Sequence, residues 1–184
     1  MTRRAVFIDR DGILNRTTVR DGKPYPPASV SSLEIPEGVL ESLLQLKALG
    51  FLLIGVTNQP DVARGTVPKE VVEDINDLLI HKLPLEDILV CPHDDKDNCS
   101  CRKPKPGLIL DAVDRYGILL EGSYMIGDRW KDIEAGKRAG CITIWIDFDY
   151  TEEYRAELPD HIASTPQEGL QFIVAREGKN GKKC

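Results

Sequence analysis

The sequence has no long hydrophobic run and no region dominated by positive charge. Its 184 residues include 24 Lys and Arg against 30 Asp and Glu, and the basic residues are scattered along the chain. No stretch approaches the roughly 20 apolar residues of a membrane span, and the N-terminus lacks the apolar core of a secretory signal. We therefore expect a cytoplasmic protein that binds neither nucleic acid nor a membrane.

The sequence also lacks internal repeats and low-complexity segments. With 184 residues, 41% of them hydrophobic, it can bury the core of one domain. We assign that domain to residues 1–176 and expect the polar residues 177–184 to form a flexible tail. Nothing in the sequence calls for a protein partner, so we expect a monomer.

Short apolar segments rich in Val and Ile alternate with longer segments of helical periodicity. This alternation predicts an α/β fold of three layers, Rossmann-like, with a parallel sheet between helices. We expect strands at residues 4–9, 51–57, 87–91, 123–127 and 142–147. We expect helices at residues 38–49, 68–81, 106–116 and 131–139. The proline-containing segment 13–35 is too short for a cap domain and is predicted to be a surface loop.

Polar residues lie just past the predicted strands or in the loop before the third helix. In open parallel sheets, ligands bind at the carboxyl ends of the strands. The residues concerned are Asp9, Asp11, Thr57, Asn58, Gln59, Arg102, Lys103 and Asp128. Each of them alone reads as an ordinary turn, capping or surface residue. Together they indicate one site at one edge of the sheet.

Two carboxylates separated by one residue can share a metal ion and still act differently. Asp9 is expected to attack a phosphorus atom and Asp11 to transfer a proton. A Mg²⁺ ion held by Asp9, Asp11 and Asp128 would offset the repulsion between two anions. The Thr57 hydroxyl and the Lys103 ammonium would hold oxygens of the transferred group. The pattern therefore predicts a magnesium-dependent phosphatase whose partner is a small phosphate ester.

Three of the five cysteines lie with one histidine in a single short segment, residues 91–101. Cys91, His93, Cys99 and Cys101 form a ligand set that suits a closed tetrahedral Zn²⁺ site. Four protein ligands leave no open position, so the zinc is expected to be structural and to position the basic residues that follow. The alternative is a group of free thiols near a turn.

Four motifs at these positions resemble the haloacid dehalogenase superfamily. They are DRDG at 9–12, TNQ at 57–59, RKPKPG at 102–107 and GDRWKD at 127–132. In that superfamily the first aspartate forms an aspartyl-phosphate and the second is the general acid and base. The resemblance therefore implies these roles for Asp9 and Asp11. It is closest to the capless branch of heptose bisphosphate and histidinol-phosphate phosphatases, which also carry a zinc loop.

The resemblance implies substrate contacts as well. The implied substrate-binding residues are Asn58, Gln59, Arg64 and Arg102. Arg102 would recognise a sugar phosphate, and the run Ala63-Arg64-Gly65 is similar to the heptose enzymes. The roles of two residues of the last motif, Arg129 and Asp132, stay open. Asp132 either binds a metal-bound water or caps the following helix, and no single role is assigned to Arg129.

Three features differ from the typical heptose enzymes. Only residues 94–98 separate His93 from Cys99, a short form that is more similar to histidinol-phosphate phosphatases. Pro60 and Asp61 stand where Ser-Gly is usual, and the loop 15–27 is longer. These parts are expected to contact the leaving group. The sequence therefore defines the phosphatase reaction better than it defines which phosphate ester is the substrate.

The favoured substrate is D-glycero-D-manno-heptose 1,7-bisphosphate, which would lose its 7-phosphate. A second phosphate needs a second cationic subsite, for which the candidates are Arg16, Arg20, Arg64 and Arg102. Within the same chemistry, the alternatives are histidinol phosphate and other small sugar phosphates. The alternative from a different class is a non-catalytic, zinc-bearing binding module.

Overall fold

Six parallel strands form one sheet in the computed structural model, which describes residues 3–152 and 157–180. They lie in the order β5 (Asp87–Cys91), β4 (Leu52–Asn58), β1 (Ala5–Ile8), β6 (Tyr124–Gly127), β7 (Ile142–Ile146) and β8 (His161–Ala163). The five strands predicted from the sequence are all present, each within one residue of its predicted bounds. The short strand β8 was not predicted.

The central strand β1 shows how a short apolar segment joins two halves of the core. All four of its residues are buried, and successive side chains point to opposite faces of the sheet. Val6 and Ile8 belong to one hydrophobic cluster, whereas Ala5 and Phe7 belong to the other. A strand that is buried on both faces reads as a continuous hydrophobic run, which is why the sequence predicted it.

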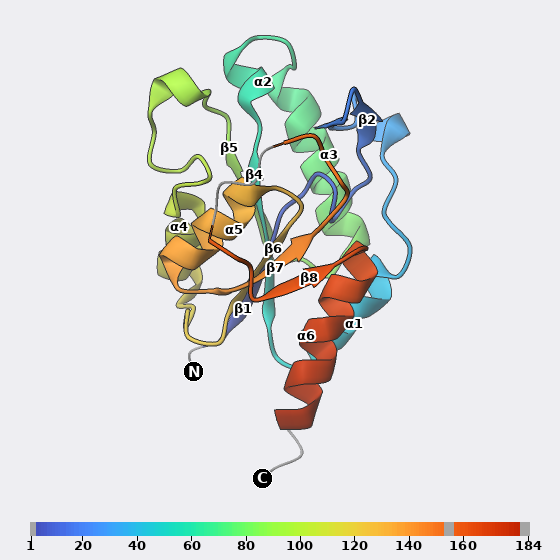
Figure 1. The fold of residues 1–184 in the computed structure, drawn as a ribbon. Helices are drawn as coiled ribbons and strands as arrows, with labels where there is room; N and C mark the ends of the chain where they lie inside the picture. The colour runs from blue at the N-terminus through green and yellow to red at the C-terminus, as the bar shows by residue number, and fades with distance from the viewer. Residues whose placement is uncertain (1–2, 153–156, 181–184) are drawn as a thin grey trace.

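Helices cover both faces of the sheet and complete three layers (Figure 1). The first cluster contains residues of α1 (Val39–Ala48), α3 (Lys69–Lys82) and α6 (Pro166–Asn180). The second contains residues of α4 (Gly107–Tyr116) and α5 (Trp130–Ala139). This arrangement confirms the predicted three-layer α/β fold without a large cap domain. Among the described helices, none combines the length and apolar composition needed to cross a bilayer.

The segment 13–35, predicted to be a loop, contains regular structure. Strands β2 (Thr18–Arg20) and β3 (Lys23–Tyr25) form an antiparallel hairpin, which the 3-10 helix η1 (Val30–Ser32) follows. Asp21 and Gly22 connect the strands with φ values of 49° and 68°, as two-residue hairpin turns require. In Figure 1 this hairpin, the short helix α2 (Pro60–Ala63) and the loop after β5 lie at the same end of the molecule.

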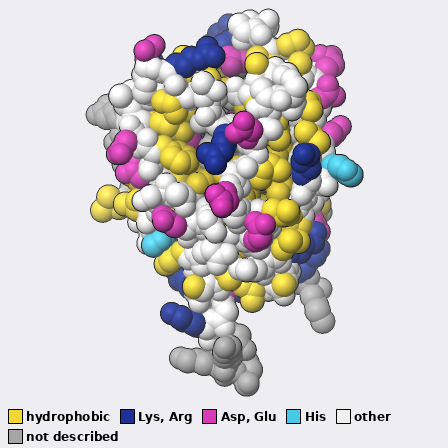
Figure 2. Space-filling model, turned by 90° about the vertical axis from the view of Figure 1, so that its right-hand side faces the viewer, with side chains coloured by type: hydrophobic (Ala, Val, Ile, Leu, Met, Phe, Trp, Pro, Cys, Tyr) yellow, Lys and Arg dark blue, Asp and Glu magenta, His cyan; other side chains and the backbone are white. Residues whose placement is uncertain are grey.

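The surface seen in Figure 2 mixes hydrophobic side chains with charged side chains of both signs. No stripe of Lys and Arg crosses this face. The view therefore agrees, for this face, with the scattered basic residues of the sequence.

Helix α6 corrects the predicted flexible tail. It continues through Asn180, and Glu177 is only 8% exposed. The Tyr124 hydroxyl donates to Glu177 Oε1 over 2.5 Å, and Arg4 Nη1 lies 2.8 Å from Glu177 Oε2. Residues 177–180 therefore belong to the folded domain, and the rest of the predicted tail, 181–184, lies outside the described residues.

Replacing Glu177 with alanine should lower the free energy of unfolding by about 1–3 kcal/mol, because the buried Tyr124 hydroxyl loses its acceptor. Urea denaturation would measure the change. The exposed Lys179 on the same helix offers a control, since Lys179→Ala removes a surface side chain and should change stability by less than about 0.5 kcal/mol. Equal stability of the two variants would contradict an anchoring role for Glu177.

Candidate active site

A cavity of about 370 Å³ opens at the carboxyl edge of the sheet. The predicted site residues that line it are Asp9, Asp11, Thr57, Asn58, Gln59, Arg64, Arg102, Lys103, Arg129 and Asp132. Those at the ends of β1, β4 and β6 come together because these strands are neighbours that end at this edge. The sheet thus gathers motifs that are far apart in the sequence.

Three buried carboxylates form a group at the base of the site. Asp9, Asp128 and Asp132 each offer a carboxylate oxygen, and these oxygens lie within 4.8 Å of one another. Asp128 Oδ2 accepts a hydrogen bond from the Tyr150 hydroxyl (2.9 Å), whereas Oδ1 is buried without a partner among the described residues. An unpartnered carboxylate oxygen in a cluster of oxygen donors fits a hard divalent cation such as Mg²⁺.

The charges of this group repel one another. Burial raises the pKa of Asp9 to about 7, and Lys103 opposes that rise. Burial also raises the pKa of Asp128 well above its usual value, and the nearby Asp9 and Asp132 raise it further. A bound cation would favour the ionised forms of both side chains.

Lys103 supplies a buried positive charge to the same group. Its Nζ atom lies 2.5 Å from Asp9 Oδ1 and 2.7 Å from Asp132 Oδ1, and it donates to the Val56 carbonyl (2.7 Å). Burial opposes the charge of Lys103, but Asp132 and Asp9 outweigh this effect and raise its pKa. The ammonium is therefore protonated at neutral pH. Asp132 thus pairs with Lys103, and it also caps α5 by accepting from the Arg129 N–H (3.0 Å).

Asp11 lies apart from the three grouped carboxylates. Its Oδ1 atom accepts from Arg10 Nη2 (2.8 Å) and Asn15 Nδ2 (3.1 Å), and its Oδ2 atom accepts from Gln59 Nε2 (2.7 Å). Arg10 is 1% exposed and also donates to Asn76 Oδ1 of α3 (3.1 Å). Asp11 was predicted to bind Mg²⁺ with Asp9 and Asp128, and the structure groups those two carboxylates with Asp132 and not with Asp11.

The residues at the end of β4 connect the other parts of the site. Gln59 Nε2 donates to Thr57 Oγ1 (2.8 Å) as well as to Asp11. Asn58 Nδ2 donates to the Lys103 carbonyl (3.0 Å), and Asn58 Oδ1 accepts from the Lys103 N–H (3.1 Å). Asn58 therefore positions Lys103. Gln59 links the side chains of Asp11 and Thr57.

Acidic side chains pair with the predicted substrate-binding arginines. Arg64 donates to both oxygens of Asp94 (2.8 and 3.0 Å). Arg102 Nε donates to Asp95 Oδ1 (2.7 Å) and Arg102 Nη1 donates to the His93 carbonyl (3.2 Å). These contacts hold the guanidinium groups of both arginines at the wall of the cavity. Arg129 is held in the same way by two bonds to Glu152 (2.7 and 2.8 Å).

Two other basic candidates lie elsewhere. Arg16 lines a separate cavity of about 410 Å³. The Arg20 guanidinium lies 5.7 Å from the centre of the Tyr25 ring. Neither arginine lines the cavity at the carboxyl edge of the sheet, so Arg64 and Arg102 are the members of the predicted set that face it.

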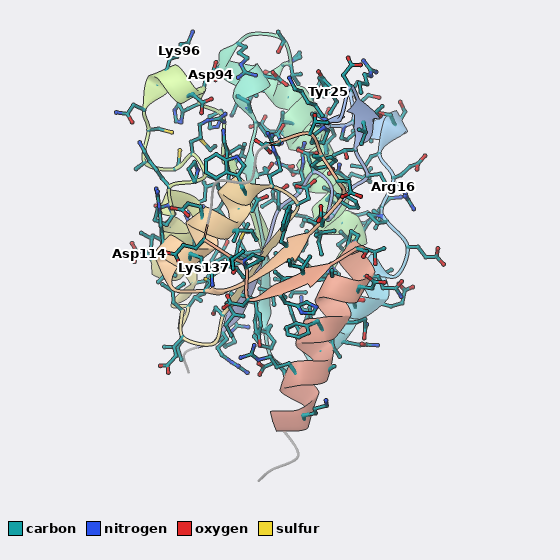
Figure 3. The ribbon with its side chains drawn as sticks, viewed as in Figure 1. Arg16, Tyr25, Asp94, Lys96, Asp114 and Lys137 are labelled. Atoms are coloured by element: carbon teal, nitrogen blue, oxygen red, sulfur yellow. The ribbon has the colours of Figure 1, made fainter. Side chains whose placement is uncertain are left out.

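The mouth of the cavity is built by the hairpin, which lies in the predicted surface loop 13–35, and by the loop after β7, which the sequence did not single out. The β2–β3 hairpin contributes Tyr25, and the loop after β7 contributes Thr151 and Glu152. The Thr151 N–H donates to the Gly22 carbonyl (3.1 Å), which joins the loop to the hairpin turn. In Figure 3, Tyr25 and Asp94 lie at the same end of the molecule on different segments. The hairpin and the loop after β7 therefore form parts of one rim, and the cysteine-rich loop approaches the cavity through Asp94, which binds Arg64.

The cysteine-rich loop gathers its four predicted metal ligands. Cys101 Sγ lies 3.2 Å from Cys91 Sγ and 3.4 Å from Cys99 Sγ, and His93 Nδ1 lies 3.4 Å from Cys101 Sγ. A tetrahedral zinc site with bonds of ~2.3 Å separates its sulfur atoms by about 3.8 Å. Three sulfur atoms and one imidazole nitrogen at nearly this spacing fit a closed metal site.

Gly12 leaves the space that Asp128 occupies. A Cβ atom at Gly12 would lie 2.1 Å from Asp128 Oδ2, and the residue has a φ of +103°. Gly50 is a matched control, because its φ is +89° and a Cβ atom there would meet nothing within 4 Å.

Alanine at Gly50 should lower the free energy of unfolding by about 1–2 kcal/mol through backbone strain alone. Alanine at Gly12 should cost at least about 1 kcal/mol more, because Asp128 must also move. Urea denaturation of the two variants would measure the difference. Equal losses would contradict a close approach of Gly12 and Asp128.

Comparisons with known proteins give the family. A family model described as HAD-hydrolase-like matches residues 100–168. D-glycero-beta-D-manno-heptose-1,7-bisphosphate 7-phosphatase of Helicobacter pylori is 38% identical over 144 residues, covering 75% of this chain and 80% of the relative. The enzyme of that name from Escherichia coli K12 is 34% identical over 151 residues, covering 76% of each chain.

The fold has the same relatives. The crystal structure of the D,D-heptose 1,7-bisphosphate phosphatase of B. bronchiseptica, in complex with magnesium and phosphate, aligns with a TM-score of 0.79. It is 23% identical and covers 94% of this chain and 99% of its own. The chain therefore belongs to the haloacid dehalogenase-like family of hydrolases, together with these phosphatases.

Proposed function

We propose that this phosphatase removes the 7-phosphate of D-glycero-β-D-manno-heptose 1,7-bisphosphate through an aspartyl-phosphate on Asp9. The observation that carries the proposal is the Lys103 ammonium, bound to both Asp9 and Asp132 beside the unpartnered oxygen of Asp128. The curated relatives named for this substrate support the choice of ester and anomer.

Asp9 is the proposed nucleophile. It lines the cavity directly after β1, and its backbone N–H donates to the Ile126 carbonyl of β6 (2.9 Å), which fixes its position at the sheet edge. A carboxylate oxygen of Asp9 would attack phosphorus and form an acyl phosphate while the bond to the ester oxygen breaks. Water would then attack the acyl phosphate, release inorganic phosphate and regenerate Asp9.

Asp11 is the proposed general acid and base. It would give a proton to the leaving ester oxygen and later take one from the attacking water. Arg10, Asn15 and Gln59 hold its carboxylate at 2.7–3.1 Å while it still lines the cavity. Because Asp11 lines the cavity but lies outside the group of Asp9, Asp128 and Asp132, we assign it to proton transfer and leave the metal to those carboxylates.

Lys103 and Thr57 are the proposed partners of the transferred phosphoryl oxygens. Both side chains are buried at the base of the cavity, where a positive charge and a hydroxyl act at a low dielectric constant. Asn58 holds the backbone of Lys103, and Gln59 holds the hydroxyl of Thr57. Charge stabilisation therefore rests on groups that are in place before the substrate arrives.

Asp9 and Asp128 are the proposed ligands of Mg²⁺, and Asp132 lies in the same group. When bound, the metal would neutralise charge that builds up on the phosphoryl group. Tyr150 orients the carboxylate of Asp128 by donating a hydrogen bond to Oδ2. The other oxygen, Oδ1, takes no part in that bond and is the proposed metal ligand. Asp132 holds the Lys103 ammonium close to Asp9.

Histidinol phosphate is the second candidate within the same chemistry, because the loop between His93 and Cys99 is short. Its amino group would need an anionic subsite. Two acids line the cavity wall near the predicted arginines, but Asp61 pairs with Arg64 and Glu152 pairs with Arg129. The wall therefore favours an anionic substituent over a cationic one.

Zn²⁺ is the proposed occupant of the cysteine-rich loop, held by Cys91, His93, Cys99 and Cys101. The spacing of the four side chains supports a closed structural site. Arg102 and Lys103 directly follow the last ligand. A metal in this loop would therefore fix the start of the segment that delivers Lys103 to Asp9.

Phosphate release with Mg²⁺ tests the substrate. A panel should contain both anomers of the heptose 1,7-bisphosphate, histidinol phosphate and hexose phosphates, with Asp9→Asn as the control. The β-bisphosphate should give the highest kcat/KM, and Asp9→Asn should reduce turnover to background because the nucleophile is lost. If histidinol phosphate gave the highest kcat/KM, it would replace the heptose bisphosphate as the proposed substrate. Phosphate release that does not depend on Asp9 would contradict the mechanism.

Metal analysis tests the cysteine-rich loop. Cys101→Ser should lower the zinc content of the purified protein and lower its melting temperature, because a metal that binds only the folded chain stabilises it. Cys141→Ser is the control, since Cys141 lies outside the cluster and its replacement should leave the zinc content at one equivalent. Unchanged zinc and stability in Cys101→Ser would contradict a structural site.

A further inference from the structure

Basic side chains line the cavity, and most of them have strong internal partners. Lys103 contacts Asp9 and Asp132, Arg64 binds Asp94 through two bonds, and Arg129 binds Glu152 through two bonds. These pairings leave little positive charge to bind a second anionic group of a substrate. A cation with a weaker internal partner would serve that purpose better.

Lys131 is such a cation. It lies in the first turn of α5, one residue before Asp132, and its side chain lines the cavity at 22% exposure. Its one ion pair with the described residues is to Asp95 Oδ1, and at 3.9 Å this contact is too long for a hydrogen bond. The ammonium also lies 5.7 Å from the centre of the Trp130 ring.

Asp95 receives a second cation at the same oxygen atom. Arg102 Nε donates to Asp95 Oδ1 over 2.7 Å, and Arg102 is 11% exposed whereas Asp95 is 69% exposed. Two positive side chains of the cavity wall thus converge on one oxygen of an exposed carboxylate. Asp95 Oδ1 thus marks a position from which one oxygen of a bound anion could contact both Arg102 and Lys131.

We propose that Lys131, together with Arg102, binds the anionic group that the enzyme does not remove, and thereby makes the enzyme selective for bisphosphates. This inference rests on the proposed function. Asp95 acts as an internal anion that keeps the two cations directed at one oxygen position until a phosphate dianion replaces it. A dianion carries more charge than a carboxylate and presents three oxygen atoms, so it binds the pair more strongly.

The test compares a bisphosphate with the monophosphate that lacks the second group, using heptose 1,7-bisphosphate and heptose 7-phosphate. In Lys131→Met, the ratio of kcat/KM for the two substrates should fall by about tenfold to 100-fold, the range for one charge-assisted hydrogen bond. The loss should lie in KM for the bisphosphate. Lys131→Arg keeps the charge and should restore most of the ratio.

Two further lysines sharpen the test: Lys96 is a control outside the cavity, and Lys23 is the competing candidate within its lining. Lys96 lies on the 3-10 helix η2 (Asp95–Asp97), and Figure 3 shows it at the outer tip of the cysteine-rich loop, so Lys96→Met should leave the ratio unchanged. Lys23 lines the cavity from the exposed hairpin side. A fall of the ratio in Lys23→Met with an unchanged ratio in Lys131→Met would overturn the proposal.

Asp95→Asn gives a change of the opposite sign. Removing the internal anion should lower KM for the bisphosphate several-fold and should leave KM for the monophosphate much less affected. Titration calorimetry of the bisphosphate into Asp9→Asn protein, with and without Lys131→Met, measures binding without turnover. Equal binding by the two proteins would overturn the inference, whereas absence of Asp9-dependent hydrolysis in the unmodified chain would overturn the proposed function itself.

Discussion

Three carboxylates and one ammonium share a small buried space at the carboxyl edge of the sheet. Burying charges costs free energy unless they are paired, and Lys103 can offset only part of the negative charge of Asp9, Asp128 and Asp132. The remaining excess explains why a divalent cation suits the site. The backbone also comes close to this group, because Gly12 and Gly127 both lie where a Cβ atom would strike an acidic side chain.

The strand order delivers these charges to one point. Asp9 directly follows β1, and the neighbouring strands β4 and β6 end next to it, with Thr57 and Asp128 at their ends. Lys103 does not belong to any of these strands. It follows the cysteine-rich segment, which comes after the edge strand β5, and Asn58 binds both polar groups of its backbone. The order of the strands therefore positions Asp9, Thr57 and Asp128. Lys103 lies on a loop, and hydrogen bonds from Asn58 position it.

The sequence predicted the parts of the fold whose signal is local. β1 and β4 are continuous apolar runs, and such runs identify buried strands without knowledge of their neighbours. Glu177 was predicted wrongly because a glutamate near the chain end reads as exposed, and its partners Tyr124 and Arg4 are distant in sequence. The hairpin was missed although Asp21-Gly22 is a strong turn signal, because Pro24 argues against a strand.

The site divides in the same way. Asp9, Asp11 and Lys103 stand in short motifs, so their types and spacing made them candidates, and the structure places all three at one cavity. Arg10 lies within the first motif, but its residue type suggested no role there. Its role depends on Asn76 of α3, which no local pattern connects to it. Tyr150 was missed for the same reason, since it reaches Asp128 from a loop that carries no motif.

The hydrogen bond between Thr151 and Gly22 joins the loop after β7 to the hairpin at the mouth of the cavity, although the two segments lie about 130 positions apart in the chain. A change in the length or direction of either segment would break this hydrogen bond unless the other segment moved as well. Variation of the opening among related enzymes is therefore expected to occur as matched changes in both segments. A transplanted hairpin would fit poorly on a foreign loop, so altering substrate choice by exchange requires that the two segments be moved together.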